Sequence, residues 1–194
     1  GQDLTIEDIT LGNPAHNEVL VEVAATGLCH TDLHFMQGHL PVQTPAVLGH
    51  ETAGIARAVG AGVTYLKPGD HVIGCLSAFC GCCEQCLSGH PSICEGQDTL
   101  LRPADAPPRL SQGGAALTQF MHLSGFSDHV LVHENALAKI DPALEPLRVD
   151  PALLGLPPSV PAAQLAGRPG SSTISSSDAV RPSPCSSIVR KSAS

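Results

Sequence analysis

The stretch GHETAGIARAVGAGV, residues 49–63, places a histidine–glutamate pair directly before a short apolar segment bounded by glycines. We expect a strand over 51–60 and another over 70–75 (DHVIGC), which follows a Pro-Gly-Asp turn. The run VLVEVAAT (19–26) is rich in β-branched residues, and HVLVHENALAKI (129–140) alternates between apolar and polar residues. Short strands at such close spacing predict a mainly β fold, a small irregular β-barrel.

The overall composition excludes several classes of function. The chain has 194 residues and a formal net charge of −8, whereas a nucleic-acid binder normally presents a basic face. No apolar run approaches the roughly 18 residues that span a bilayer, and nothing marks the first residues as a signal peptide. We therefore expect a cytoplasmic protein with no nucleic-acid and no membrane partner. The segment 95–125 is rich in glycine, proline and polar residues and predicts a long surface loop.

The character of the chain changes near Leu156. All ten histidines lie before this point, and only one acid, Asp178, follows it. Serine and proline become frequent, and apolar residues no longer recur at a regular period. We expect one domain over 1–155 and a Ser/Pro-rich tail over 156–194 that is disordered or shifted in reading frame.

A cysteine cluster, CGCCEQCLSGHPSIC, occupies residues 80–94 with the spacing C-x2-C-x2-C-x7-C. Four thiolates supply the tetrahedral sulfur shell of a structural zinc, and the expected ligands are Cys80, Cys83, Cys86 and Cys94. A disulfide framework fits a secreted protein better, and a ferredoxin-type iron–sulfur run requires a shorter last gap followed by Cys-Pro. We interpret Cys82 as a bystander and Cys75 as a buried small hydrophobe.

Two further motifs, GLCHTDLH (27–34) and GHE at the start of 49–63, precede the cysteine cluster. The second fits the pattern G-H-E-x-x-G-x5-G-x2-V, and KPGDHV (67–72) and FSDHVLVHENALAKI (126–140) follow in order. In this combination the chain resembles the zinc-dependent medium-chain alcohol dehydrogenases. The resemblance covers about residues 1–155 and implies the family's GroES-like catalytic domain, an irregular β-barrel that carries a structural-zinc lobe.

The resemblance implies a second, catalytic zinc. Its ligands would include Cys29 and His50, with Glu51 beside the metal as an alternative ligand or as a carboxylate close to it. Asp32 would accept a hydrogen bond from the non-ligating ring nitrogen of His50 and fix its tautomer. Zinc with one open position lowers the pKa of a bound alcohol, so that a zinc-bound alkoxide forms near neutral pH and expels hydride to a nicotinamide.

The same resemblance assigns three neighbours of Cys29. Thr31 would place a hydroxyl beside the substrate oxygen, His34 would carry the proton to solvent, and His30 would lie near the cofactor pyrophosphate. We expect no functional role for the other histidines, which are His16, His39, His71, His90, His122, His129 and His133.

The third ligand of such a zinc is usually a cysteine just after an ALLG-like stretch, which leads into a Rossmann domain. Here the stretch is present at 152–155, but Leu156 follows it, and no G-x-G-x-x-G occurs in the chain. One account is a natural shortened protein with a disordered tail. The account we favour is a reading-frame error or truncation near Leu156, because a CTG codon followed by C contains TGC, a cysteine codon one base over.

These observations predict that the chain belongs to a lineage of zinc-dependent enzymes that oxidise a primary or aromatic alcohol to an aldehyde with NAD or NADP. The chain alone is expected to be nearly inactive. The alternative is a non-enzymatic zinc-binding fragment that keeps only the structural zinc; a zinc-free quinone-reductase relative would lack both zinc motifs. Members of the family form homodimers or homotetramers, and we expect this fragment to be monomeric.

Overall fold

Two β-sheets form the body of the protein. The computed structural model describes residues 4–143 and 184–191. One sheet is antiparallel throughout, in the order β10-β5-β4-β2-β9. Its strands are β2 (Glu18–Thr26), β4 (Thr52–Val59), β5 (His71–Gly74), β9 (His129–His133) and β10 (Leu137–Ile140). The register between β2 and β4 shifts at two bulges, which increases the local twist and curves this sheet.

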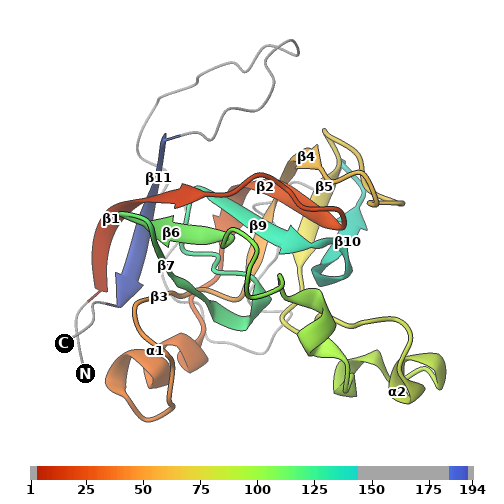
Figure 1. Ribbon diagram of the computed structural model, residues 1–194, viewed down its shortest axis with the longest axis horizontal. Coiled ribbons are helices and arrows are strands. Elements are labelled where there is room, and N and C mark those ends of the chain that lie inside the picture. Colours follow the sequence, from red (N-terminus) through yellow and green to blue (C-terminus); the bar gives the residue numbers. More distant parts are fainter. Residues whose placement is uncertain (1–3, 144–183, 192–194) are drawn as a thin grey trace.

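The second sheet has the order β7-β6-β1-β11-β3-β8. Its strands are β1 (Leu4–Leu11), β3 (Ala46–Val47), β6 (Leu110–Gln112), β7 (Ala115–Ala116), β8 (Thr118–Gln119) and β11 (Pro184–Lys191). The strands β3 and β8 run parallel, and the other pairs are antiparallel. Figure 1 shows β1 and β11 lying side by side at one flank of the molecule.

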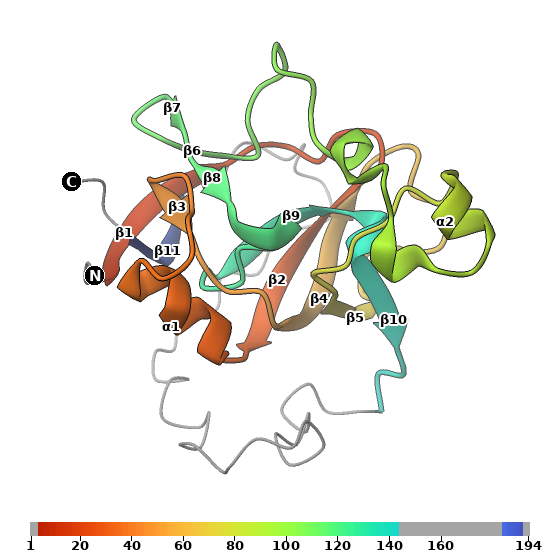
Figure 2. The same ribbon diagram turned by 90° about the horizontal axis from the view of Figure 1, so that it is seen from below.

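In residues 4–143 and 184–191, helical structure is limited to short segments. The helix α1 (His30–Gln37) follows β2, and α2 (Glu84–Leu87) lies in the cysteine-rich segment. These two helices lie on opposite sides of the molecule in both views (Figures 1 and 2). Single 3-10 turns occupy Pro91–Ile93, Gln97–Leu100, Phe120–His122 and Glu134–Ala136.

The main core is built from the β-branched residues of the five-stranded sheet. Val19 and Val21 of β2 are buried together with Val130 and Val132 of β9, because alternate residues of a strand share one face. Leu123, which is fully buried, packs in the same cluster. The barrel interior is therefore filled by aliphatic side chains and provides a rigid support for the loops at its ends.

A buried ion-pair network ties β2 to the segment that follows the cysteine cluster. Glu18 accepts hydrogen bonds from Arg102 Nε at 3.0 Å and from Arg109 Nε at 2.7 Å. Burial alone would raise the pKa of Glu18, but hydrogen bonds from Arg102, from the Ala15 amide and from Arg109 lower this pKa to about 2. Glu18 therefore stays ionised, and it fixes both arginines against the barrel.

The expected mainly β fold is confirmed, as are the strands expected within 19–26, 51–60 and 70–75. The segment 129–140 contains two strands rather than one, because a 3-10 turn at Glu134–Ala136 separates β9 from β10. No Rossmann domain is present among the described residues. Among the described residues, no helix is long and apolar enough to cross a membrane.

Two expectations were wrong. The segment 95–125 is not simply a surface loop: it contributes short strands, and its leucines enter the core, where Leu100, Leu110, Leu117 and Leu123 are buried. Prolines, glycines and polar residues separate these leucines, so the sequence shows no regular hydrophobic period that would predict their burial. Cys75 is exposed rather than buried, because β5 ends at Gly74 and Cys75 lies beyond the sheet.

The sequence predicted no strand between 156 and 194, yet 184–191 form β11, which pairs with β1 and β3. The rest of that segment lies outside the described residues, as do Leu156 and the ALLG stretch at 152–155.

Candidate metal centres

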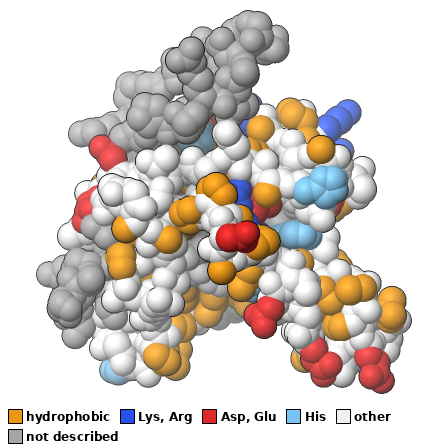
Figure 3. Space-filling view, viewed as in Figure 1, with side chains coloured by type: hydrophobic (Ala, Val, Ile, Leu, Met, Phe, Trp, Pro, Cys, Tyr) orange, Lys and Arg blue, Asp and Glu red, His pale blue; other side chains and the backbone are white. Residues whose placement is uncertain are grey.

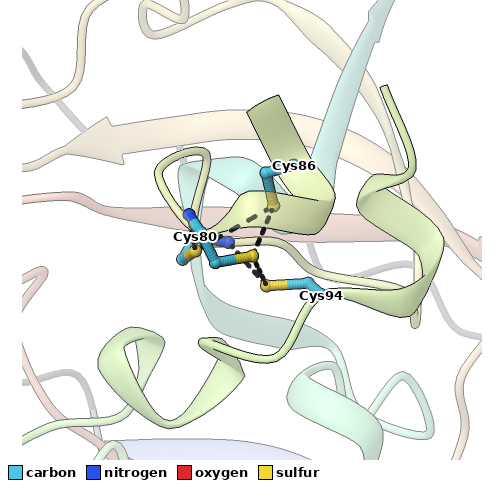
Figure 4. Close-up of side chains that lie close together, drawn as sticks. Cys80, Cys86 and Cys94 are labelled. Carbon is cyan, nitrogen blue, oxygen red and sulfur yellow. Dashed lines mark hydrogen bonds between the residues drawn. The ribbon is translucent and has the colours of Figure 1, made fainter. Parts of the chain in front are cut away.

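Four cysteine sulfurs converge in the segment that contains α2. The sulfurs of Cys80, Cys83, Cys86 and Cys94 all lie within 4.8 Å of one another. The Sγ–Sγ distance is 3.4 Å for Cys83 and Cys86, 3.8 Å for Cys83 and Cys94, and 3.9 Å for Cys80 and Cys86. Figure 4 shows Cys80, Cys86 and Cys94 pointing toward a common centre. With Zn–S bonds of about 2.3 Å, a tetrahedral site has sulfurs about 3.8 Å apart, so the four residues fit zinc.

Backbone amides surround these sulfurs. The amides of Cys82 and Cys83 donate to Cys80 Sγ, and those of Cys80 and Gly96 donate to Cys94 Sγ, at 3.2 to 3.5 Å. The first two bonds lower the pKa of Cys80 to about 6, whereas burial raises the pKa of Cys86 to about 12. A divalent cation at the centre would favour the thiolate form of all the ligands, because metal binding displaces the thiol protons.

The segment that carries these cysteines, residues 79–97, has no buried side chain of its own. Leu87 and Ile93 are 75% and 60% exposed. Figure 3 shows acidic and hydrophobic side chains together on this projection, at the lower right where Figure 1 places α2. Because no apolar core holds this segment together, we expect metal binding to stabilise its fold.

A second group of ligand side chains lies at the start of α1. One ligand atom each from Cys29, His50 and Glu51 can be chosen so that all three lie within 4.8 Å of one another. Cys29 is the residue that precedes α1, and His50 and Glu51 lie between β3 and β4. His50 is buried, whereas Cys29 and Glu51 are partly exposed, so the group has both a fixed imidazole and access to solvent.

Asp32 connects the two segments that supply this group. Its Oδ1 atom lies 3.3 Å from His50 Nδ1 and accepts a hydrogen bond from the Gly49 amide at 3.2 Å. Its Oδ2 atom accepts from the Cys29 amide at 3.3 Å. Asp32 is itself buried, so the carboxylate is held in one place and leaves His50 Nε2 as the ring nitrogen free for a metal.

The conformation of Gly49 and a pair of phenylalanines complete this environment. Gly49 has φ = +92°, and a Cβ there would lie 2.5 Å from the Phe126 amide nitrogen, so the backbone before His50 requires glycine. The Phe120 ring lies edge-on to His50, with ring centroids 5.8 Å apart, and Phe35 of α1 packs against Phe120. Phe120 was not predicted from the sequence, since a lone phenylalanine in a polar segment gives no signal.

The structure places the other expected site residues on α1. Thr31 is partly buried in the first turn, and His30 is exposed at the first position. His34 lies against His30, with ring centroids 4.7 Å apart, and its Nδ1 is 3.2 Å from Nδ1 of His39. The contact with His39 was also missed, because it depends on the left-handed turn at Gly38 that ends α1.

The third cysteine ligand of the resembled family has no counterpart that the structure can place, because Leu156 lies outside the described residues. Within the described chain, Glu51 is the residue that joins Cys29 and His50. A thiolate, an imidazole and a carboxylate are all ligands that zinc accepts, so these residues fit a catalytic type of site.

Comparison with known proteins identifies the family to which the chain belongs. The family described as the alcohol dehydrogenase GroES-like domain matches residues 15–142. S-(hydroxymethyl)glutathione dehydrogenases from Escherichia coli O1:K1 and from Shigella sonnei are each 45% identical over 147 residues, which are 73% of this chain and 40% of theirs. The chain thus spans about 40% of the length of the curated relatives it matches.

Solved structures show the same likeness. A benzyl alcohol dehydrogenase from Acinetobacter calcoaceticus superposes with a TM-score of 0.63 at 31% identity, over 78% of this chain and 44% of that one. An alcohol dehydrogenase zinc-binding domain protein from Burkholderia ambifaria gives a TM-score of 0.61 at 34% identity, over 71% and 43% of the two chains. With the fold, the four-cysteine cluster and the family match in agreement, the chain belongs to the medium-chain zinc alcohol dehydrogenases and carries their GroES-like domain.

Proposed function

We propose that this chain is the zinc-binding part of a dehydrogenase that oxidises a primary or aromatic alcohol to an aldehyde with NAD or NADP. The observation that carries this proposal is the group formed by Cys29, His50 and Glu51, which Asp32 orients from both sides. The substrate class is supported by the relatives named as S-(hydroxymethyl)glutathione and benzyl alcohol dehydrogenases, which both act on a hydroxyl at a primary carbon.

The residues around this group have distinct roles in the proposal. A zinc ion with one open position supplies a Lewis acid that lowers the pKa of a bound alcohol. The Thr31 hydroxyl accepts the proton of the alcohol and passes it toward His34, whose contact with the exposed His39 leads to solvent. His30, at the N-terminal end of α1, is assigned to the cofactor pyrophosphate, because a helix N-terminus favours an anion.

Metal analysis tests whether both centres load. We expect about two zinc ions per chain, one in the four-cysteine cluster and one in the Cys29 group. The variants Cys29→Ser and His50→Ala should each lose one of them and keep the other. Cobalt(II) substitution gives a second measurement, since visible absorption distinguishes a tetrahedral four-sulfur site from one with mixed ligands. A wild-type content near one zinc, unchanged in Cys29→Ser, would contradict the proposal.

The alternative function is a zinc-binding fragment without enzymatic activity. It is favoured by the difference between the two centres: all four cysteine ligands lie in the described chain, whereas a leucine stands at the position expected for the third ligand of the other. Under either function we expect the isolated chain to show no NAD- or NADP-linked turnover of an alcohol. The zinc content therefore decides between them, and the turnover assay does not.

We also propose that the family's sequence ends near residue 155 and that 156–194 is of different origin, although 184–191 pair with β1 and β3 as β11. Independent sequencing of the gene across codons 150–165 tests this proposal. We expect a frame in which a cysteine codon replaces that of Leu156. An open frame that encodes Leu156 in every independent read would contradict a frame error.

A further inference from the structure

A fifth thiol lies beside the four-cysteine cluster. Cys82 is exposed and does not belong to the group of converging sulfurs, yet its Sγ lies 3.7 Å from Cys80 Sγ. The Cys82 thiol is the hydrogen-bond donor and the Cys80 sulfur is the acceptor. An exposed thiol in contact with a ligand sulfur is placed to react with that sulfur once the ligand sulfur has been oxidised.

The local backbone explains this contact. Gly81 separates the two cysteines and has φ = +79°, a left-handed conformation that folds the chain back on itself. The Cys82 amide also donates to Cys80 Sγ, at 3.5 Å. The turn therefore holds both the amide and the thiol of Cys82 against one sulfur.

We propose that Cys82 is a resolving thiol for Cys80 and makes the zinc lobe reversibly sensitive to peroxide. This inference rests on the proposal that the four-cysteine cluster holds zinc. In the first step the Cys80 thiolate attacks one oxygen of hydrogen peroxide, the O–O bond breaks, hydroxide leaves, and Cys80 becomes a sulfenic acid. In the second step the Cys82 sulfur attacks the Cys80 sulfur, the S–O bond breaks, and the departing hydroxide takes the Cys82 proton as water.

Together the two steps consume one thiolate, one thiol and one hydrogen peroxide. They form one disulfide, one hydroxide ion and one water molecule. Peroxide is reduced by two electrons and the two sulfurs are oxidised. Because a disulfide sulfur is not a zinc ligand, the cluster loses one of its four thiolates. The segment 79–97 has no buried side chain of its own, so it should lose order along with the metal.

The test uses the zinc-loaded chain, brief treatment with hydrogen peroxide, and alkylation after denaturation with removal of zinc. We expect zinc to be released, Cys80 and Cys82 to escape alkylation, and the other cluster cysteines to be labelled. A reductant added before denaturation should restore zinc binding. A disulfide that joins Cys83 to Cys86, whose sulfurs are 3.4 Å apart, with Cys82 labelled, would overturn the proposal.

Two variants sharpen the test. In Cys82→Ser the Cys80 sulfenic acid has no resolving thiol at this turn and proceeds to the sulfinic acid, which ordinary reductants do not reverse, so zinc recovery should fall several-fold. Cys75→Ser is the matched control: Cys75 is equally an exposed thiol and lies outside the group of converging sulfurs, so its recovery should equal that of the wild type.

Zinc content before peroxide separates this inference from the zinc assignment. A chain that holds no zinc in the cluster contradicts the assignment, whereas equal recovery in Cys82→Ser and in the wild type contradicts the role of Cys82. If Cys82→Ser does not load zinc, the wild-type chain alkylated at Cys82 in its folded, zinc-loaded state replaces it. That adduct should also recover several-fold less zinc after peroxide and reductant.

Discussion

Asp32 shows how much of a metal centre depends on a residue that does not bind the metal. Its two carboxylate oxygens contact the Cys29 amide, the Gly49 amide and the His50 ring. Cys29 and His50 are far apart in the sequence: Cys29 directly precedes α1, and His50 lies between β3 and β4. The buried carboxylate therefore sets both the distance between the two ligands and the orientation of the imidazole.

The substitution Asp32→Asn should weaken the Cys29 centre and spare the four-cysteine cluster. A neutral amide presents one acceptor oxygen instead of two, so either Cys29 or His50 loses its support. Loss of such a contact typically lowers metal affinity by about 10- to 100-fold. Competition with a chromogenic chelator measures the affinity of each centre. Asp105→Asn, at an exposed acid, is the control, and an unchanged affinity in Asp32→Asn would refute the role.

At the scale of elements, β2 carries two glutamates whose ion pairs with arginines differ in burial. Glu18 is 3% exposed and binds both Arg102 and Arg109, whereas the side chains of Glu22 and Arg57 are 46% and 42% exposed. The Glu18 network joins β2 to the chain that follows the zinc lobe. The exposed pair joins β2 to β4, which the sheet already holds together by backbone hydrogen bonds.

Glu18→Gln should destabilise the domain far more than Glu22→Gln. Removing the charge of Glu18 leaves the buried Arg109 and the partly buried Arg102 without an opposite charge, and breaking a buried ion pair in this way typically costs about 3–5 kcal/mol. An exposed pair typically contributes about 0–1 kcal/mol. Urea unfolding followed by circular dichroism measures both variants. Equal free energies of unfolding for the two variants would show that the buried network does not stabilise the fold.

The same network should make stability depend on pH. The pKa of Glu18 is about 2 in the folded chain against 4.5 for a free glutamate, so the unfolded state takes up the proton more readily. The contribution of Glu18 is present above pH 4.5 and is lost as the pH falls from 4.5 toward 2. Unfolding of the wild type over this range should show the loss, and the slope should be smaller in Glu18→Gln.

At the scale of the whole molecule, segments that are distant in the sequence pack together in one hydrophobic core. Leu123 comes from a stretch rich in polar residues, yet it is fully buried among the valines of β2 and β9. The second sheet depends on distant parts in the same way, because β1 near the start of the chain pairs with β11 near its end. The barrel is thus a product of long-range contacts rather than of local preference.

Leu123→Ala should therefore destabilise the whole domain. Truncating a buried leucine typically costs about 2–5 kcal/mol, because the transfer free energy is lost and a cavity remains. Leu87→Ala, at a side chain that is 75% exposed, should change the free energy of unfolding by less than about 0.5 kcal/mol. Thermal unfolding of the two variants gives the comparison. Similar effects would mean that 95–125 is not part of the core.

The sequence by itself determined the class of the fold, the strands β2, β4 and β5 of the five-stranded sheet and the four cysteines that converge. These features are local: the alternation of β2 and the close spacing of Cys80, Cys83 and Cys86 need no information from elsewhere in the chain. The motifs 27–34 and 49–51 likewise carried the family resemblance.

Only the tertiary structure decided what lies between these features. The burial of Leu123, the Glu18 network, the contact of His34 with His39 and the exposure of Cys82 and Cys75 each depend on where a turn ends or how distant segments pack. Hydrophobic periodicity in the sequence does not predict such contacts, because they are made by single side chains in irregular segments. Hydrophobic pattern and ligand spacing report the local geometry of the chain, whereas burial and long-range pairing exist only once the barrel has closed.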